Sequence, residues 1–242
     1  MGSFPPLPLR VVLVEPRNPL NIGAAARALS NFGFAELRLV KPYEVAFQEA
    51  RSAVRSRYVL EQARVFDTVA EAVSDCALVV GSTADDKRDL HIPLYRLETA
   101  ARVLHDALAR APAAILFGSE KFGLSNEHLS HCQWGFRIPA RAEHGSMNLG
   151  QAVAVSLYEL RREVSAEAQL FPAPTGLVAA DAERATVLLL EILRRSGYTQ
   201  ERTSVSSEQK LRRLIRRAHI PASDGETWLG ILRQILWKLR GG

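Results

Sequence analysis

The sequence predicts an α/β fold in which a largely parallel β-sheet is followed by a small helical region at the C-terminal end. Three observations predict it. Short runs of β-branched and other apolar residues recur through the first part of the chain, and stretches with helical spacing separate them. This alternation is typical of a parallel sheet. After a segment rich in Pro, only amphipathic helical patterns remain.

The apolar runs predicted as strands are residues 9–14, 37–40, 77–80, 113–117 and 134–138. The chain has 242 residues, of which 47% are hydrophobic, so it can bury such strands in a core. Between the first two runs, residues 18–32 are predicted as a helix, because Pro19 and Gly33 are typical start and stop signals. The spacing of Val153, Leu157 and Leu160 predicts another helix from 149 to about 162, which ends the α/β part.

The Pro- and Gly-containing segment 171–176 cannot continue a helix and marks a boundary. We therefore divide the chain into an α/β domain (1–168), a linker (169–180) and a basic helical extension (181–242). Helices are expected at about 182–195, about 208–218 and 225–239. In the second of these, an apolar stripe is predicted to pack and a basic face to remain outside. The stripe is Leu211, Leu214, Ile215 and Ala218, and the basic residues are Lys210, Arg212, Arg213, Arg216 and Arg217.

Positive charge is concentrated at the C-terminal end. From Arg184 onward the chain has 12 Lys or Arg against 5 Asp or Glu, whereas the preceding 183 residues have 19 against 21. A basic segment beside a near-neutral body indicates a polyanion such as a nucleic acid as partner. The alternative is a solvated basic helical face.

The rest of the composition points to a cytoplasmic protein that uses neither metal nor membrane. Cys76 and Cys132 lack the spacing of a metal or redox site, so both are predicted to be buried thiols in a reducing compartment. The six histidines show no ligand spacing. No apolar run approaches the ~20 residues that span a bilayer, and the first residues do not resemble an export signal.

Residues 15–27 are the first of three segments whose composition suggests a functional site. A strand end runs here into a helix whose first turns are almost all small residues, which permits close approach of a neighbouring element or of a ligand. Arg27 is unusual within that run, although a solvated helix arginine is the alternative. Asn21 can equally be a hydrogen-bonding residue of the helix start.

The other two segments follow predicted strands. Residues 115–127 leave a strand through Gly118, pass Glu120 and turn again at Gly123, and ligands of open α/β sheets bind outside the carboxyl ends of strands. Residues 138–148 form a polar loop before the last helix of the α/β part. Ser146 and Asn148 in this loop can alternatively be helix caps.

In their order and in their residues, the three segments together resemble the three motifs of SPOUT methyltransferases of the TrmH type. The resemblance is strongest to the members that methylate the tRNA anticodon loop. The matching residues are Asn21-Ile-Gly-Ala-Ala-Ala-Arg27, then Phe117-Gly-Ser-Glu120 with Gly123-Leu124 and Asn126-Glu127, then Ser146-Met-Asn-Leu149. The resemblance covers about residues 10–165, and the basic helical extension is similar too. In one departure, Asp85 and Asp86 follow Gly81-Ser-Thr-Ala84, where relatives usually have Arg.

The resemblance implies a parallel sheet with a C-terminal deep trefoil knot, a homodimer with both sites at the subunit interface, and S-adenosyl-L-methionine as the cofactor. The reaction implied is 2′-O-methylation of a tRNA ribose, at cytidine or uridine in position 32 of the anticodon loop. Carried over to matching positions, the cofactor-binding residues would be Ser82, Thr83, Ala84, Gly118, Ile138, Gly145, Ser146 and Met147. The glycine pattern after the first strand does not fit a dinucleotide-binding turn.

By the same resemblance the catalytic residues would be Arg27, with Asn21, Glu120, Ser146 and Asn148 around it. A guanidinium holds its proton too tightly to act as a general base, so clamping of the RNA phosphate is the role we expect for Arg27. The alternative functions are a ribosomal-RNA 2′-O-methyltransferase and a non-catalytic RNA-binding protein that keeps the fold.

Overall fold

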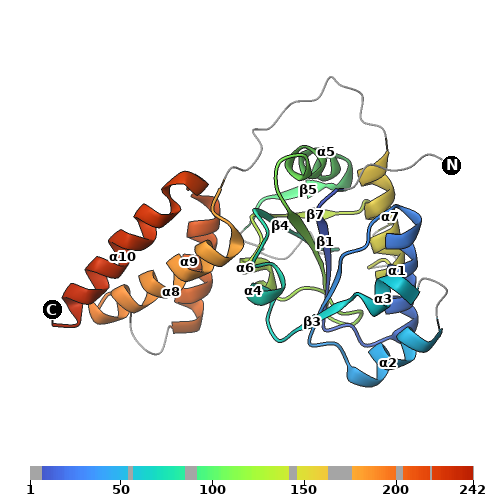
Figure 1. The fold of residues 1–242 in the computed structure, drawn as a ribbon, viewed down its shortest axis with the longest axis horizontal. Coiled ribbons are helices and arrows are strands. Elements are labelled where there is room, and N and C mark those ends of the chain that lie inside the picture. The colour runs from blue at the N-terminus through green and yellow to red at the C-terminus, as the bar shows by residue number, and fades with distance from the viewer. Residues whose placement is uncertain are drawn as a thin grey trace.

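The structure is a computed structural model that describes residues 7–53, 57–84, 92–141, 146–162, 176–199, 204–218 and 220–241. An α/β part and a group of C-terminal helices lie side by side, with the C-terminus at the far end of the helices (Figure 1). Along the described chain the named strands all precede residue 138, and the elements after residue 176 are helices.

A seven-stranded sheet with the order β3-β2-β1-β6-β4-β7-β5 forms the centre of the α/β part, and all its pairs are parallel. The strands are β1 (Leu9–Val14), β2 (Leu37–Val40), β3 (Arg64–Phe66), β4 (Leu78–Ser82), β5 (Leu94–Arg96), β6 (Ala113–Phe117) and β7 (Trp134–Arg137). The prediction located β1, β2 and β6 at these bounds, and located β4 and β7 within two residues. It missed β3 and β5, which are the edge strands and have three residues each, too few to show a periodic pattern.

The helices of the α/β part connect these strands. They are α1 (Pro19–Asn31), α2 (Glu44–Ala53), α3 (Arg57–Glu61), α4 (Val69–Ala72), α5 (Leu97–Leu108), α6 (Asn126–Ser130) and α7 (Leu149–Arg161). The sequence predicted α1 and α7 correctly. Asn18 caps α1 by accepting a hydrogen bond from the Leu20 N–H, and Gly33, with φ of 69°, follows its end.

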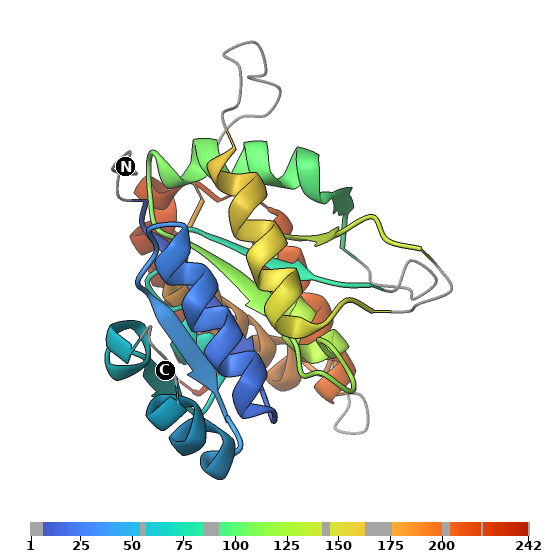
Figure 2. The same cartoon turned by 90° about the vertical axis from the view of Figure 1, so that its right-hand side faces the viewer.

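The sheet separates two apolar cores. Side chains of β1 alternate between them, with Val11 and Leu13 on one face and Val12 and Val14 on the other. The first face is covered by α1, α7 and α5, and α1 and α7 lie next to each other across it (Figure 2). The second face is covered directly by the short helices α4 and α6 and by the start of α8.

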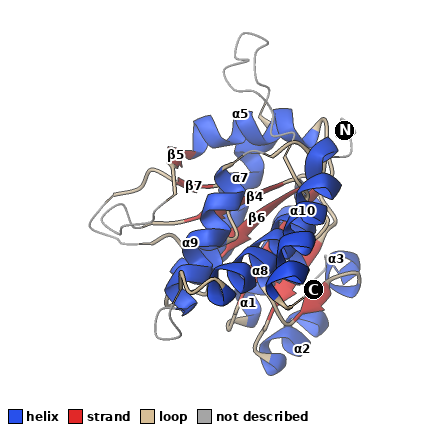
Figure 3. Ribbon diagram, turned by 90° about the vertical axis from the view of Figure 1, so that its left-hand side faces the viewer, coloured by secondary structure: helices blue, strands red, loops and turns tan. Residues whose placement is uncertain are grey.

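The C-terminal helices are α8 (Ala179–Arg195), α9 (Ser204–Arg217) and α10 (Gly225–Leu239), with a short 3-10 turn, Ala222–Asp224, before the last. They share a core of their own and lie over the second face of the sheet (Figure 3). The Ala179 N–H donates to the Cys76 carbonyl at 2.8 Å, and the Ala180 N–H donates to the Ser74 carbonyl at 3.1 Å. The helix therefore begins earlier than about 182, inside the predicted linker, of which residues 169–175 lie outside the described residues.

The predicted basic outer face of α9 is confirmed for Lys210 and Arg217, which are exposed, but is wrong for the other three arginines. Arg212, Arg213 and Arg216 are only 4–7% exposed, whereas Leu214 of the expected packing stripe is 53% exposed. Apolar spacing was a misleading signal here, because Arg212 pairs with Glu183 and Glu208, and Arg213 and Arg216 donate to backbone carbonyls.

Cys76 and Cys132 are buried free thiols, as predicted, and burial raises the pKa of each to about 12. Within the described part of the chain, no helix is both long and apolar enough to cross a membrane.

Candidate functional site

The carboxyl ends of β1, β6, β4 and β7 lie next to one another at a single edge of the sheet, because these strands are parallel neighbours. This order brings three sequence-predicted positions together. Ser82 ends β4, Gly118 directly follows β6 and Ile138 directly follows β7. Such an edge, where loops leave adjacent parallel strands, is the usual ligand site of an open α/β sheet.

Three residues, one from each predicted motif, form a continuous hydrogen-bonded chain beside this edge. The Asn21 amide nitrogen donates to Glu120 Oε1 at 3.0 Å, and the Asn148 amide nitrogen donates to Asn21 Oδ1 at 2.8 Å. These contacts join positions 99 and 127 residues apart in the sequence. Asn21 is only 6% exposed, and these two hydrogen bonds hold its side-chain amide on both sides.

Glu120 also holds the loop that follows β1. Its carboxylate accepts hydrogen bonds from the backbone N–H groups of Arg17, at 3.1 Å, and Asn18, at 3.0 Å. Burial raises the pKa of Glu120, but the hydrogen bonds from Asn21 and from these backbone groups outweigh it, so the pKa lies below its usual value. Glu120 is thus an ionised acceptor at neutral pH and orients the start of α1.

The local sequence explains how these residues reach their positions. Asn148 caps α7 by accepting the Gln151 N–H at 3.2 Å, so the capping alternative is correct for Asn148 and coexists with its contact to Asn21. The turn that presents Glu120 closes through a hydrogen bond from the Gly123 N–H to the Ser119 carbonyl at 2.8 Å. Gly123 has a φ of 65°, which favours glycine.

Two glycines permit the close packing of the backbone around these residues. A side chain at Gly118 would collide with the backbone of Gly123 and Leu124. A Cβ at Gly150 would lie 2.6 Å from the Cβ of Ala24, so α1 and α7 pack closely only because Gly150 has no side chain. Gly150 and the Asn18 cap were not predicted from the sequence, although Asn directly before Pro at a helix start is a recognisable capping signal.

Arg27 does not join this group within the subunit. It lies six residues beyond Asn21 on α1, which is about 9 Å along the axis and about 120° around it. The side chain is exposed, and the described residues include no hydrogen-bond or ion-pair partner for it.

The predicted cofactor positions have mixed environments. Ser82, Thr83, Gly118, Ile138 and Met147 are half-buried, and Ala84 and Ser146 are exposed. The Thr83 N–H donates to the Phe136 carbonyl at 2.9 Å, which ties the loop after β4 to β7. Gly145, Asp85 and Asp86 lie outside the described residues. No group of three potential metal ligands occurs among the residues that the structure describes.

Comparison with known proteins decides which family carries this arrangement. Residues 8–158 match the SpoU rRNA Methylase family. The chain belongs to the SpoU methylase family. The resemblance that the three motifs indicated is thereby confirmed, and the match covers every motif.

Relatives within the SpoU methylase family include proteins named TrmJ. The chain is 34% identical to the tRNA (cytidine/uridine-2′-O-)-methyltransferase TrmJ of Sodalis glossinidius over 94% of this chain and 89% of that protein. It is 42% identical to the tRNA (cytidine/uridine/adenosine-2′-O-)-methyltransferase TrmJ of Pseudomonas aeruginosa over 63% of this chain and 60% of that protein. The crystal structure of TrmJ from Z. mobilis superposes with a TM-score of 0.81 at 31% identity, covering 93% and 98% of the two chains. The similarity to TrmJ thus extends through the C-terminal helices.

Proposed function

We propose that this protein is an S-adenosyl-L-methionine-dependent methyltransferase that methylates a ribose 2′-oxygen of tRNA. The observation that carries the proposal is the hydrogen-bonded chain of Glu120, Asn21 and Asn148, which joins all three methyltransferase motifs beside the strand ends. The TrmJ relatives, named for tRNA 2′-O-methylation and similar over nearly the whole chain, support tRNA as the substrate.

The anticodon loop, with cytidine or uridine at position 32, is the target that we propose. A neighbouring position is the competing target, since a structure concerned with 2′-OH methylation of C/U34 on tRNA matches at 27% identity with a TM-score of 0.50. Because the family is named for rRNA methylation, ribosomal RNA is a second candidate substrate. We propose the cytoplasm as the site of action, where tRNA is modified.

The loops after β4, β6 and β7 fit S-adenosyl-L-methionine. They offer small and polar residues at adjacent strand ends, and the turn at Gly118 packs too closely to admit a side chain. The residues proposed to hold the cofactor are Ser82, Thr83, Ala84, Gly118, Ile138, Gly145, Ser146 and Met147. When bound, the cofactor supplies a methyl group that its sulfonium makes electrophilic. The order of β6, β4 and β7 supports the further proposal that these loops form a deep trefoil knot.

The remaining tasks of catalysis are orientation of the 2′-hydroxyl, removal of its proton and binding of the adjacent phosphate. Asn21, held by Glu120, and Asn148, held by Asn21, are proposed to orient the ribose together with Ser146, two residues before the α7 helix cap. Arg27 is proposed to bind the phosphate through its planar guanidinium, so that the proton leaves to phosphate or water.

The position of Arg27 supports a homodimer. Its side chain points away from Asn21 in its own subunit, so it can serve a site only if another subunit brings one to the exposed face of α1. That face and the adjoining face of α7 carry exposed apolar residues. These are Leu20, 77% exposed, Tyr158, 55% exposed, and Val155, 37% exposed. We therefore propose that α1 and α7 form the subunit interface and that Arg27 acts on the partner's site.

Basic residues of α9 and α10 are proposed to contact the tRNA backbone. Because Arg212, Arg213 and Arg216 are buried, this contact depends on the exposed cations Lys210, Arg217, Arg233 and Arg240. Such contacts contribute affinity without sequence specificity.

The test is methylation of an unmodified tRNA transcript with labelled cofactor, followed by mapping of the product nucleotide, in buffer that contains a metal chelator. Methylation of a ribose 2′-oxygen is the expected result. A protein that binds tRNA but transfers no methyl group would support the non-catalytic alternative, and methylation of ribosomal RNA alone would support the second substrate.

A mixing experiment tests the shared site. Asn148→Asp keeps a good helix cap but removes the amide donor to Asn21, and Arg27→Ala removes the proposed phosphate contact. Each variant should be inactive alone, whereas a mixed dimer should hold one intact site, made of Asn148 from one subunit and Arg27 from the other. Equal mixing should then restore about a quarter of the wild-type activity, because about half of the dimers are mixed. If Arg27 acts within its own subunit, the mixture will stay inactive.

A further inference from the structure

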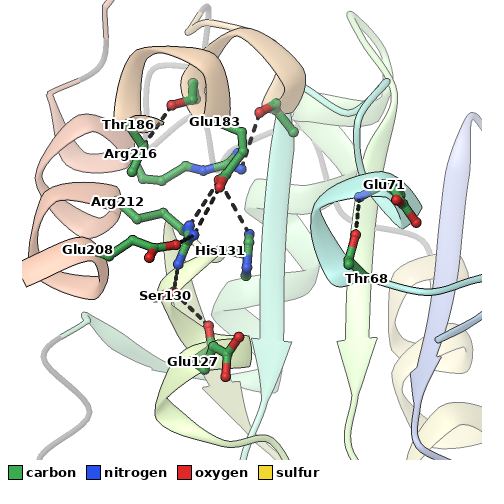
Figure 4. Close-up of polar contacts among 12 residues, drawn as sticks. Thr68, Glu71, Glu127, Ser130, His131, Glu183, Thr186, Glu208, Arg212 and Arg216 are labelled. Atoms are coloured by element: carbon green, nitrogen blue, oxygen red, sulfur yellow. Dashed lines mark hydrogen bonds and ion pairs between the residues drawn. The ribbon is translucent and has the colours of Figure 1, made fainter. Parts of the chain in front are cut away.

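A buried ionic cluster joins α6 of the α/β part to α8 and α9 of the C-terminal helices (Figure 4). Arg212, only 5% exposed, lies at its centre. Its Nε and Nη2 donate to the two carboxylate oxygens of Glu183, both at 2.9 Å, and Nη2 also contacts Glu208. Its Nη1 donates to Ser130 Oγ at 3.1 Å, and that hydroxyl in turn donates to the Glu127 carbonyl at 2.6 Å.

Two further ionisable groups complete the cluster. Arg216, 4% exposed, donates to the Ala179 carbonyl at 3.4 Å, and burial lowers its pKa to about 10. His131 Nδ1 lies 3.8 Å from Glu183 Oε2. Burial, together with the nearby Arg212 and Arg216, holds the pKa of His131 well below its usual value, so the ring is neutral. The charges therefore balance, with two arginines against Glu183 and Glu208.

Attaching the C-terminal helices to α6 through buried charges is energetically unfavourable compared with an apolar contact. Removing charges from water costs free energy, and an apolar contact of similar volume is often as stable or more so. What a bidentate arginine adds is a defined geometry. The guanidinium of Arg212 fixes the end of α6 relative to α8 and α9 through directional bonds.

Leu129, the residue of α6 next to Ser130, packs against β4 directly before the loop proposed to bind the cofactor. A Cβ at Gly81 would lie 2.7 Å from Leu129 Cδ2 and 3.2 Å from Cys132 Sγ, so β4 and these side chains are closely packed. The buried side chain of Gln133 also bridges to β4, accepting the Val79 N–H at 2.9 Å and donating to the Ala77 carbonyl at 3.1 Å. A shift of α6 therefore moves Gly81 and the residues that follow it, Ser82 to Ala84.

We propose that Arg212 is a positioning residue for cofactor binding: by holding α6 against β4, it sets the loop Ser82–Thr83–Ala84 in the shape that accepts the cofactor. The proposal rests on the proposed function in that this loop contacts the cofactor. It gives the C-terminal helices a second task besides RNA binding, since they complete the support of the cofactor loop from the second face of the sheet.

The experiment measures the affinity of S-adenosyl-L-methionine for the full chain by calorimetry, without RNA, at a temperature where circular dichroism shows each variant fully folded. Arg212→Met should weaken the affinity by about two- to thirty-fold, the range of coupling through packed networks. Arg212→Lys should lie between Arg212→Met and wild type, because the ammonium keeps the charge but not the bidentate geometry. The matched control is Arg184→Met, which removes an exposed pair with Asp181 on α8 and should leave the affinity unchanged.

A folded Arg212→Met protein with wild-type cofactor affinity would overturn the proposal and leave the cluster as a purely stabilising contact. If Arg212→Met does not fold, Ser130→Ala gives the decision, because it removes only the hydroxyl between Arg212 and α6. Weakened cofactor binding in Ser130→Ala supports the proposal, and unchanged binding overturns it. Wild-type protein that binds no cofactor would instead contradict the proposed function itself.

Discussion

Replacing Gly118 by Ala tests the candidate cofactor site, because it adds a single methyl group where the turn after β6 leaves no room. The added Cβ would collide with the backbone of Gly123 and Leu124, which cannot rotate away as a side chain can. Overpacking of this kind costs about 1–3 kcal/mol, and a backbone contact places Gly118→Ala near 3. For a chain of this size each kcal/mol shifts Tm by about 2–4 °C, so we expect a decrease of about 6–12 °C.

Gly230 provides the matched control. It lies within α10, and an added Cβ there has nothing within 4 Å. Gly230→Ala should therefore stabilise the helix by about 0.5–1 kcal/mol and raise Tm slightly. Thermal unfolding followed by circular dichroism measures both variants, and calorimetry measures the cofactor affinity, which only Gly118→Ala should lose. If Gly118→Ala unfolds at the wild-type temperature and binds cofactor normally, the close turn described for the second motif is incorrect.

Two further predictions concern Arg27 and the C-terminal helices. Arg27→Ala and Arg27→Lys should both lose most turnover while keeping cofactor affinity and Tm, because an exposed residue that contacts mainly the transition state contributes little to folding. Near-normal turnover of Arg27→Ala would refute the phosphate-binding role. Deleting residues 176–242 should destabilise the α/β part as well as weaken tRNA binding, since Ala179 belongs to the second core of the sheet and pairs with Cys76. Thiol titration measures this effect, and Cys76 and Cys132 that remain as unreactive as in the full chain would contradict it.

Local patterns in the sequence predicted most strands of the sheet and the helices α1 and α7. The strands β1, β2 and β6 are largely apolar runs, interrupted only by Arg10 and Arg38, because central parallel strands are buried on both faces. The helices α1 and α7 were recognisable from their start and stop residues and from helical spacing. The edge strand β5 and the four-residue helix α4 carry too few residues for a period, so their place depends on pairing and packing with distant segments.

For the candidate site too, the sequence predicted some features and the tertiary structure alone showed the others. The motif residues Asn21, Glu120 and Asn148 were identifiable in the sequence, because the three segments that contain them resemble the ordered motifs of the family. Their hydrogen bonds to one another, and the separation of Arg27 from them within one subunit, appeared only in the tertiary structure. Sequence spacing specifies which way a side chain points on its own helix, but not which distant segment the fold brings to meet it.

The basic C-terminal segment illustrates the limit most directly. By itself the sequence determined that α9 is amphipathic and that positive charge gathers after Arg184. Only the tertiary structure decided that Arg212 and Arg216 face inward, because their partners, Glu183 and the Ala179 carbonyl, belong to a distant part of the chain. Glu183, which pairs with Arg212 in the buried cluster, lies 29 residues away on α8. Burial of charge is therefore a property of the packed pair rather than of either residue, and no local pattern records it.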